Sequence, residues 1–143
     1  MKHKIIPFLA GALVVFLCIT AFSPNDKNEE GYILQKEKDI AKEEAGPHAG
    51  GGKTTGMDFF AKDPAMKLAF RKRVLHPGSS IGYHLQEKEE IYYVVSGNGI
   101  MDMNGKSFPV EAGDAILTHT GSSHGLKPAA DKDLVLIINY ELK

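Results

Sequence analysis

Short apolar segments alternate with turn residues along the second half of the chain. From Phe59 onward, runs such as EEIYYVVS, DAILTH and DLVLIINYEL are separated by turn signals such as HPGSS, SGNG and EAGD. Asn104 and Gly105 form a strong two-residue hairpin signal, because both residue types tolerate positive φ. Strands this short, without amphipathic helices between them, predict an antiparallel sandwich or barrel. Closure into a barrel, or dimerisation, would protect the edges of such a sheet.

The first residues of the chain have a different pattern. The basic stretch MKHK precedes a long apolar run from Ile5 to Phe22. This order is typical of an export signal, and the run is also long enough to remain as a membrane anchor, with residues 5–22 as the tether. Residues 1–22 are therefore predicted to be a signal peptide or an N-terminal membrane anchor, and the domain is predicted to be exported to the periplasm or the extracellular space.

Cys18 is the lone cysteine of the chain, so an intramolecular disulfide is excluded. Lipidation at Cys18 is an alternative to cleavage or anchoring, but Leu17 before it is larger than the residue that lipoprotein sites use. The chain has 143 residues and a formal net charge of −1. It is therefore one domain at most, and it lacks the basic excess that would indicate nucleic acid as a partner.

Residues 23–58 are predicted to form a polar, Gly-rich N-terminal arm that precedes a barrel at residues 59–143. Within the arm, GGKT is similar to part of a phosphate-binding loop, but Pro47 stands where the first glycine of that motif belongs. We therefore interpret residues 46–56 as a flexible connector. The alternative is a loop that folds over the mouth of a pocket, with His48 reaching inward to bind substrate.

Side chains that can bind a metal ion gather around one turn. His84 and Gln86 are two residues apart, so on a strand they share a face with Cα atoms ~6–7 Å apart. Glu90 opens the next apolar strand, and by the same alternation Tyr92 shares its face. The later stretch HTGSSHGL supplies two further histidines. The pattern indicates a site where side chains from separate strands converge.

These stretches resemble the two cupin motifs. The first motif, G-x5-H-x-H-x3,4-E-x6-G, is similar to the segment that begins at Gly78, with Gln86 in the place of the second histidine. The second motif, G-x5-P-x-G-x2-H-x3-N, is similar to the segment from Gly113 to Pro128. There His124 takes the ligand position, and His119 stands where proline is usual. The resemblance covers about residues 70–140, which is nearly all of the predicted barrel.

The resemblance implies an all-β fold, a cupin-type double-stranded β-helix (jelly-roll) barrel of short antiparallel strands, often dimeric. It also implies a divalent metal ion inside the barrel, and carried over position by position the ligands would be His84, Gln86, Glu90 and His124. Gln86 offers a neutral oxygen, so this shell suits Mn²⁺, Fe²⁺ or Zn²⁺. Sugar-phosphate isomerases of this class resemble it, since they use glutamine. The alternative is that Gln86 marks a lost site in a barrel without metal.

Four further side chains are candidates for substrate chemistry. Tyr92 could orient a substrate or act as an acid, or it could be part of the core with its hydroxyl satisfied. His119 could be a general acid or base, since histidine titrates near neutral pH, or it could face solvent on its loop. Arg71 and Arg73 share one strand face and could bind a carboxylate or phosphate of a substrate. A solvated face explains the two arginines equally well.

Taken together, the sequence predicts an exported cupin with a divalent metal ion. We expect a metal-dependent enzyme of the isomerase, lyase or dioxygenase type, with a small polar or sugar-like molecule as substrate. The alternative is a non-catalytic module that binds a small molecule or sugar and has a degenerate metal site. A homodimer is expected in either case.

Overall fold

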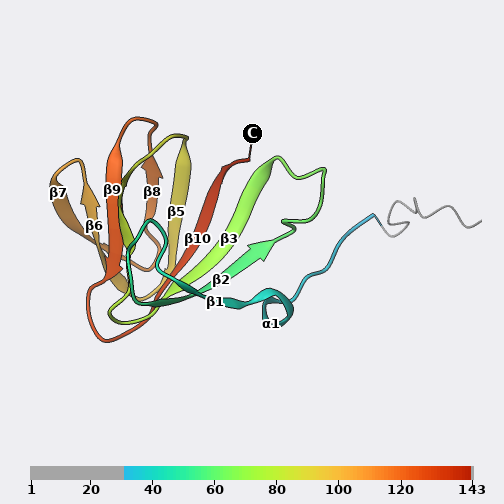
Figure 1. Cartoon of the computed structure of the whole chain (residues 1–143), viewed down its shortest axis with the longest axis horizontal. Helices are drawn as coiled ribbons and strands as arrows, with labels where there is room; N and C mark the ends of the chain where they lie inside the picture. The colour runs from blue at the N-terminus through green and yellow to red at the C-terminus, as the bar shows by residue number, and fades with distance from the viewer. Residues whose placement is uncertain (1–30, 143) are drawn as a thin grey trace, which may run out of the picture. The chain divides into compact units, whose positions relative to one another are not determined.

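The computed structural model describes residues 31–142 and contains two antiparallel sheets that face each other (Figure 1). The larger sheet has the strand order β1-β2-β3-β10-β5-β8, and the smaller has the order β4-β9-β6-β7. Many neighbours in the sheets are not consecutive in the chain, as in a jelly roll. The structure confirms the predicted all-β jelly-roll barrel of short antiparallel strands. The predicted signal or anchor segment, residues 1–22, lies outside the described residues.

The two sheets are built from ten short strands. The larger sheet contains β1 (Lys42–Ala45), β2 (Lys53–Phe59), β3 (Leu68–Leu75), β10 (Leu134–Glu141), β5 (Glu90–Ser96) and β8 (Ala115–Thr118). The smaller sheet contains β4 (Ile81–Leu85), β9 (Ser123–Pro128), β6 (Asn98–Met103) and β7 (Lys106–Glu111). Among the described residues, one short helix, α1 (Glu37–Ile40), precedes them. None of the helices in the described part of the chain is long and apolar enough to span a membrane.

The core lies between the sheets and follows the alternation of the strands. On β5, Tyr92 and Val94 point inward and are buried, while Tyr93 and Val95 point outward and are exposed. The same alternation on the other strands produces one cluster, made of Leu75, Ile81, Tyr92, Val94, Met101, Val110, Leu126, Leu134, Leu136 and Ile138. Burial of each such side chain contributes about 1.5–3 kcal/mol. This apolar core fixes the register that positions the polar side chains described below.

The hairpin between β6 and β7 has the turn that the sequence predicts. Asn104 and Gly105 both have positive φ, of 48° and 78°. They connect Met103 and Lys106, which are paired in register. A two-residue turn of this kind matches the right-handed twist of the strands that it joins. The predicted two-residue hairpin is therefore confirmed.

The segment assigned to a polar arm, residues 23–58, contains two strands of the larger sheet. β1 pairs with β2, and β2 pairs with β3. The segment looks solvated in the sequence because its inward side chains are themselves polar. Thr54 is fully buried and Glu44 is half-buried, and both contact Arg73 of β3. The polar composition of these strands therefore reflects hydrogen bonding to a buried arginine.

The loop between β1 and β2 packs tightly against β4. The backbone N–H of Gly82 donates to the carbonyl of Pro47 at 2.9 Å, and the Ser80 hydroxyl donates to the carbonyl of Gly50 at 2.6 Å. A Cβ added at Gly50 or Gly82 would lie 2.0 Å from a backbone oxygen, so glycine is needed at both positions. These contacts correspond to the alternative in which the loop folds over a pocket, and they carry His48 to the cavity.

Candidate metal centre

His84 and His124 lie side by side on two strands of the smaller sheet. They are direct register partners on β4 and β9, and their ring centroids are 4.5 Å apart. Nδ1 of His84 is 2.8 Å from the carbonyl oxygen of Gly82. Because a carbonyl only accepts, Nδ1 carries the proton and Nε2 keeps its lone pair. A ring oriented in this way by a backbone carbonyl is the usual arrangement of a histidine that binds metal.

Glu90 brings a carboxylate to the two histidines from the other sheet. It is the first residue of β5 and is only 9% exposed. Its Oε2 lies 3.7 Å from Nε2 of His124. Ligand atoms of His84, Glu90 and His124 all lie within 4.8 Å of one another. Two imidazole nitrogens and one carboxylate at this spacing form a donor set that suits Zn²⁺, Fe²⁺ or Mn²⁺.

Tyr92 connects two of these side chains. Its hydroxyl donates to Oε2 of Glu90 at 2.5 Å and lies 2.9 Å from Nε2 of His124. Since the phenolic proton is donated to Glu90, His124 makes the second contact by donating from Nε2. Nδ1 of His124 is buried and has no hydrogen-bond partner among the residues that the structure describes. A metal ion bound at Nε2, the nitrogen that lies 3.7 Å from Oε2 of Glu90, would replace the proton that this nitrogen donates to Tyr92.

Burial sets the protonation states of the centre. It lowers the pKa of His124 to about 4, with further lowering by the neighbouring His84 and His48. His124 is therefore neutral at pH 7, which is the form that binds metal. Burial also raises the pKa of Glu90, and the hydrogen bond from Tyr92 opposes that rise. The pKa of Tyr92 is raised well above its ordinary value by burial and by Glu90, so the phenol stays protonated.

Gln86 directly follows the last residue of β4, two positions after His84. Its side chain is nearly buried, and its Nε2 donates to the carbonyl of Lys88 at 2.7 Å. Its backbone N–H donates to Ser122, and its carbonyl accepts from Gly121. The amide nitrogen is thus occupied, and the amide oxygen is the group that remains for a ligand. A role for Gln86 as the fourth metal ligand stays a prediction.

A cavity of about 420 Å³ opens beside the cluster. It brings together most of the side chains that the sequence singles out, namely His48, Arg71, Arg73, His84, Gln86, Glu90 and Tyr92. The imidazole of His48 stacks on that of His84, with ring centroids 3.5 Å apart and an interplanar angle of 3°. Burial, His84 and Arg73 lower the pKa of His48. The neutral ring therefore forms part of the wall next to the candidate ligands.

His119 is not among the described residues that line the cavity. Its side chain is 72% exposed, and its Nδ1 lies 2.7 Å from Oε2 of Glu89 on the surface. Glu89 also accepts from the backbone N–H of Thr120 at 3.2 Å. This position matches the solvent-facing alternative for His119. A role as general acid or base stays a prediction that no contact with the cavity supports.

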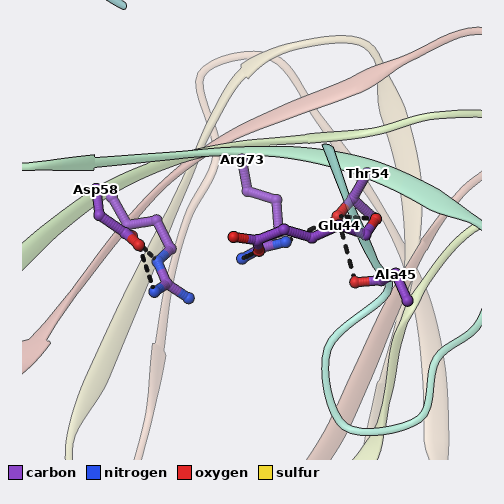
Figure 2. A network of polar contacts seen from close by, with 6 residues as sticks. Glu44, Ala45, Thr54, Asp58 and Arg73 are labelled. Atoms are coloured by element: carbon purple, nitrogen blue, oxygen red, sulfur yellow. Dashed lines mark hydrogen bonds and ion pairs between the residues drawn. The ribbon is translucent and has the colours of Figure 1, made fainter. Parts of the chain in front are cut away.

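Three polar residues of β1 and β2 contact the arginines that line the cavity, although sequence reasoning did not identify them. Glu44 and Thr54 contact Arg73, and Asp58 contacts Arg71 (Figure 2). Asp58 is the last residue of the segment predicted to be a polar arm, and its spacing gave no signal. Glu44 had no distinguishing signal, because Glu43 beside it has the same chemistry. Only the pairing of β1, β2 and β3 shows that Glu44, and not Glu43, contacts Arg73.

Comparisons with known proteins agree with this architecture. A family model described as "Cupin domain" matches residues 72–140. The chain is 32% identical to an oxalate-binding protein of Thermotoga maritima over 111 residues, which cover 76% of this chain and 92% of that protein. The crystal structure of a predicted oxalate decarboxylase from Thermotoga maritima matches with a TM-score of 0.70 and 32% identity, and covers 78% of this chain and 100% of that one.

A more distant solved structure shares the fold alone. It is a putative sugar phosphate isomerase from Acidithiobacillus ferrooxidans, which matches with a TM-score of 0.64 and 20% identity. The match covers 77% of this chain and 75% of that chain. Similar barrels therefore carry proteins with different described activities, so chemistry has to be argued from the residues of the cavity.

Proposed function

Because this chain belongs to the cupin family, we propose that it binds a divalent metal ion in its barrel and, at that ion, a small carboxylate such as oxalate. The observation that carries the proposal is the convergence of His84, Glu90 and His124 next to a cavity. When bound, a divalent ion supplies positive charge that attracts and polarises oxygen ligands. The oxalate-binding relative, which the chain covers almost completely, supports the ligand class.

The side chains of the cavity favour an anionic ligand of small size. The cavity volume of about 420 Å³ accommodates a compact molecule. Arg71 and Arg73 line it and carry positive charge, and His48 adds a flat imidazole. Guanidinium groups suit carboxylates because they donate several hydrogen bonds in fixed directions. These residues would orient the ligand while the cluster holds the metal ion.

A second candidate is turnover of the bound carboxylate, and Tyr92 is the observation that favours it. The phenol lies between Glu90 and His124 and stays protonated at neutral pH. A protonated group next to a bound ligand can stabilise developing negative charge on oxygen by hydrogen bonding. A lyase reaction on a carboxylate is the form of enzyme activity that we propose. Binding without turnover is the alternative, and a Tyr92→Phe variant separates the two.

The test begins with metal analysis of the protein, purified without chelator or histidine tag, by plasma mass spectrometry. We expect about one equivalent of Mn, Fe or Zn, and we expect calorimetry to detect oxalate binding only in the metal-loaded protein. The variant His124→Ala should lose both. The matched control is His119→Ala, which removes an exposed histidine and should retain both. Metal and oxalate binding that survive in His124→Ala would contradict the proposal.

We also propose that the protein is exported and forms a homodimer. The apolar run at residues 5–22 supports export or tethering, as argued from the sequence. The outer face of the larger sheet supports the dimer, because Ile91, Tyr93, Val95 and Leu117 are each between 44% and 50% exposed. Large apolar side chains grouped on one face are typical of an interaction surface.

A further inference from the structure

Two arginines occupy the inner face of β3. Arg71 and Arg73 both line the cavity, while Lys72 between them pairs with Glu37 near the surface. Arg73 is only 2% exposed. A guanidinium that is buried to this extent is retained when it has charged and hydrogen-bonding partners. The partners of each arginine therefore indicate what the side chain is positioned to do.

The guanidinium of Arg71 forms an ion pair with a carboxylate on the neighbouring strand. Asp58 of β2 is its direct register partner. Nε and Nη2 of Arg71 both donate to the carboxylate of Asp58, one to each oxygen. This is a bidentate pair that uses the side of the guanidinium best suited to a carboxylate. Arg71 is thus committed largely to a partner within the protein.

Arg73 has a different arrangement, because its register partner on β2 is Gly56. Its guanidinium extends past this glycine to β1, where Nη2 donates to Oε2 of Glu44 at 2.9 Å. Nη1 donates to the hydroxyl oxygen of Thr54 at 2.8 Å. Figure 2 shows the guanidinium of Arg73 beside the carboxylate of Glu44. A Cβ at Gly56 would lie 3.1 Å from Glu44 Oε2 and 3.3 Å from Arg73 Nη2, so the glycine leaves space for the pair.

Among the described residues, one of the three guanidinium nitrogens of Arg73 has no acceptor. Its Nε is buried and has no hydrogen-bond partner within residues 31–142. A buried charged donor without an acceptor is unfavourable, and an acceptor in the cavity would satisfy it. The cavity that Arg73 lines also contains His84, Glu90 and Tyr92. A ligand held at the metal centre therefore lies in the same space as this donor.

We propose that Arg73 is the anion anchor of the cavity, with its Nε–H donating to a carboxylate oxygen of the ligand. Glu44 is its positioning residue, since it accepts from Nη2 and so fixes the guanidinium without using Nε. The inference rests on the proposed function. It specifies a small ligand with oxygen acceptors at both ends, one end at the metal centre and the other at Arg73. Oxalate and malonate have this chemistry, and a monocarboxylate with an apolar tail does not.

The direct test is NMR of the arginine Nε–H groups in protein loaded with zinc, which is diamagnetic. The Arg73 signal is assigned by its loss in Arg73→Lys. We expect the signal to shift on addition of oxalate, with the same dissociation constant that calorimetry measures, and to stay unchanged with neutral oxamide. If oxalate shifts signals of the metal ligands while the Arg73 signal stays unchanged, the inference is wrong and the proposed function stands. If oxalate shifts no signals, both are wrong.

Variants at Glu44 test the positioning role. Glu44→Ala should weaken oxalate binding about tenfold, because a charge-assisted hydrogen bond that orients Arg73 is lost. Glu44→Gln keeps an acceptor oxygen and should restore most of the affinity. The dissociation constant of zinc should change by less than about twofold in both variants, since Glu44 does not belong to the cluster of His84, Glu90 and His124. This separation between oxalate and zinc affinity would not arise from a general loss of fold.

The matched control is Glu43→Ala on the same strand. Glu43 pairs with Lys53 at the surface, and its side chain is 67% exposed. We expect this variant to bind oxalate as the unmodified protein does. Equal oxalate affinity in Glu43→Ala and Glu44→Ala would overturn the positioning role. If Glu44→Ala does not fold, the Arg73 signal of the unmodified protein still decides whether Arg73 binds the ligand, and a Glu44→Gln protein that loses oxalate affinity would contradict the expected rescue.

Discussion

His84 and His124 are direct register partners on adjacent strands, although they come from two motifs that are distant in the sequence. The separation of their rings is therefore set by the hydrogen bonding of β4 to β9 and does not depend on a flexible loop. Glu90 reaches the same point from the opposite sheet. The donor set is thus held by the packing of the two sheets, and a rigid scaffold of this kind favours a defined metal geometry.

The first prediction concerns His84. Replacement by alanine should weaken metal binding at least about 100-fold, because one of three donors is lost. The free energy of unfolding of the metal-free protein should fall by only about 1 kcal/mol, since the imidazole is half-buried and the apolar core is unchanged. Metal titration and urea unfolding measure the two quantities. A metal-free His84→Ala protein that does not fold would show that His84 is structural.

The second prediction concerns the pH dependence of the metal-free protein. The pKa of His124 is about 4 in the folded state against 6.5 for an ordinary histidine. Between these values the unfolded chain binds a proton that the folded chain excludes, so stability contributed by neutral His124 is complete above about pH 6.5 and is lost as pH falls toward 4. The contribution is about 3 kcal/mol as an upper bound. Unfolding measured across this range should show the loss.

Ionisation of Glu90 changes the free energy of unfolding with pH in the opposite direction to His124. A variant at His124 therefore serves as the control for the pH experiment. Its folded-state pKa is raised by burial, so its ionised form costs stability at neutral pH and protonation on acidification relieves that cost. His124→Gln should therefore reduce the acid loss, and we assign the loss that remains to His48, whose pKa is also lowered by burial. An unchanged acid loss in His124→Gln would assign the effect to another group.

The third prediction concerns Gly56. Alanine at this position places a Cβ 3.1 Å from Oε2 of Glu44 and 3.3 Å from Nη2 of Arg73, so the pair has to separate by a few tenths of an ångström. We expect Gly56→Ala to weaken oxalate binding several-fold and to lower the free energy of unfolding by about 1 kcal/mol. A double-mutant cycle with Glu44→Gln checks the cause. We expect Gly56→Ala to weaken oxalate binding by different factors in the unmodified protein and in Glu44→Gln. Equal factors would show that Gly56 acts independently of the Arg73–Glu44 pair.

The sequence predicted the candidate metal centre because two pairs of its residues have short-range spacing and because the resemblance to the cupin motifs added His124. Residues two apart on a strand share a face, so strand alternation alone groups His84 with Gln86 and Glu90 with Tyr92. The pairing of Arg73 with Glu44 has no such spacing. It depends on the register between β1, β2 and β3 and on the absence of a side chain at Gly56.

Composition also obscured the N-terminal strands. From the sequence, polar residues such as Glu44 and Thr54 are expected to face solvent. In the structure both accept hydrogen bonds from the buried Arg73. His48 was similarly ambiguous, since glycine-rich loops are usually flexible. Here the glycines at positions 50 and 82 allow the two backbones to pack against each other. Long-range partners of this kind determine whether a polar segment is a linker or a cavity wall.

The last prediction concerns the outer face of the larger sheet. Ile91 on β5 is the register partner of Leu117 on β8, and both are about half exposed, as is Tyr93 on the same face. Burial of this face against a second copy would remove apolar area from water and protect the edge of the sheet. We expect sedimentation to show a dimer, and Tyr93→Glu to shift it toward monomer because a carboxylate would be buried at the interface.

The control for this experiment is Tyr83→Glu, which changes an aromatic residue on the other sheet that is exposed to 57%. It should leave the sedimentation behaviour unchanged, because Tyr83 lies on the smaller sheet and outside the face that carries Ile91 and Leu117. Metal content should stay at about one equivalent in both variants, since neither residue belongs to the cluster. An unmodified protein that is monomeric, or equal dissociation in the two variants, would contradict a dimer formed through this face.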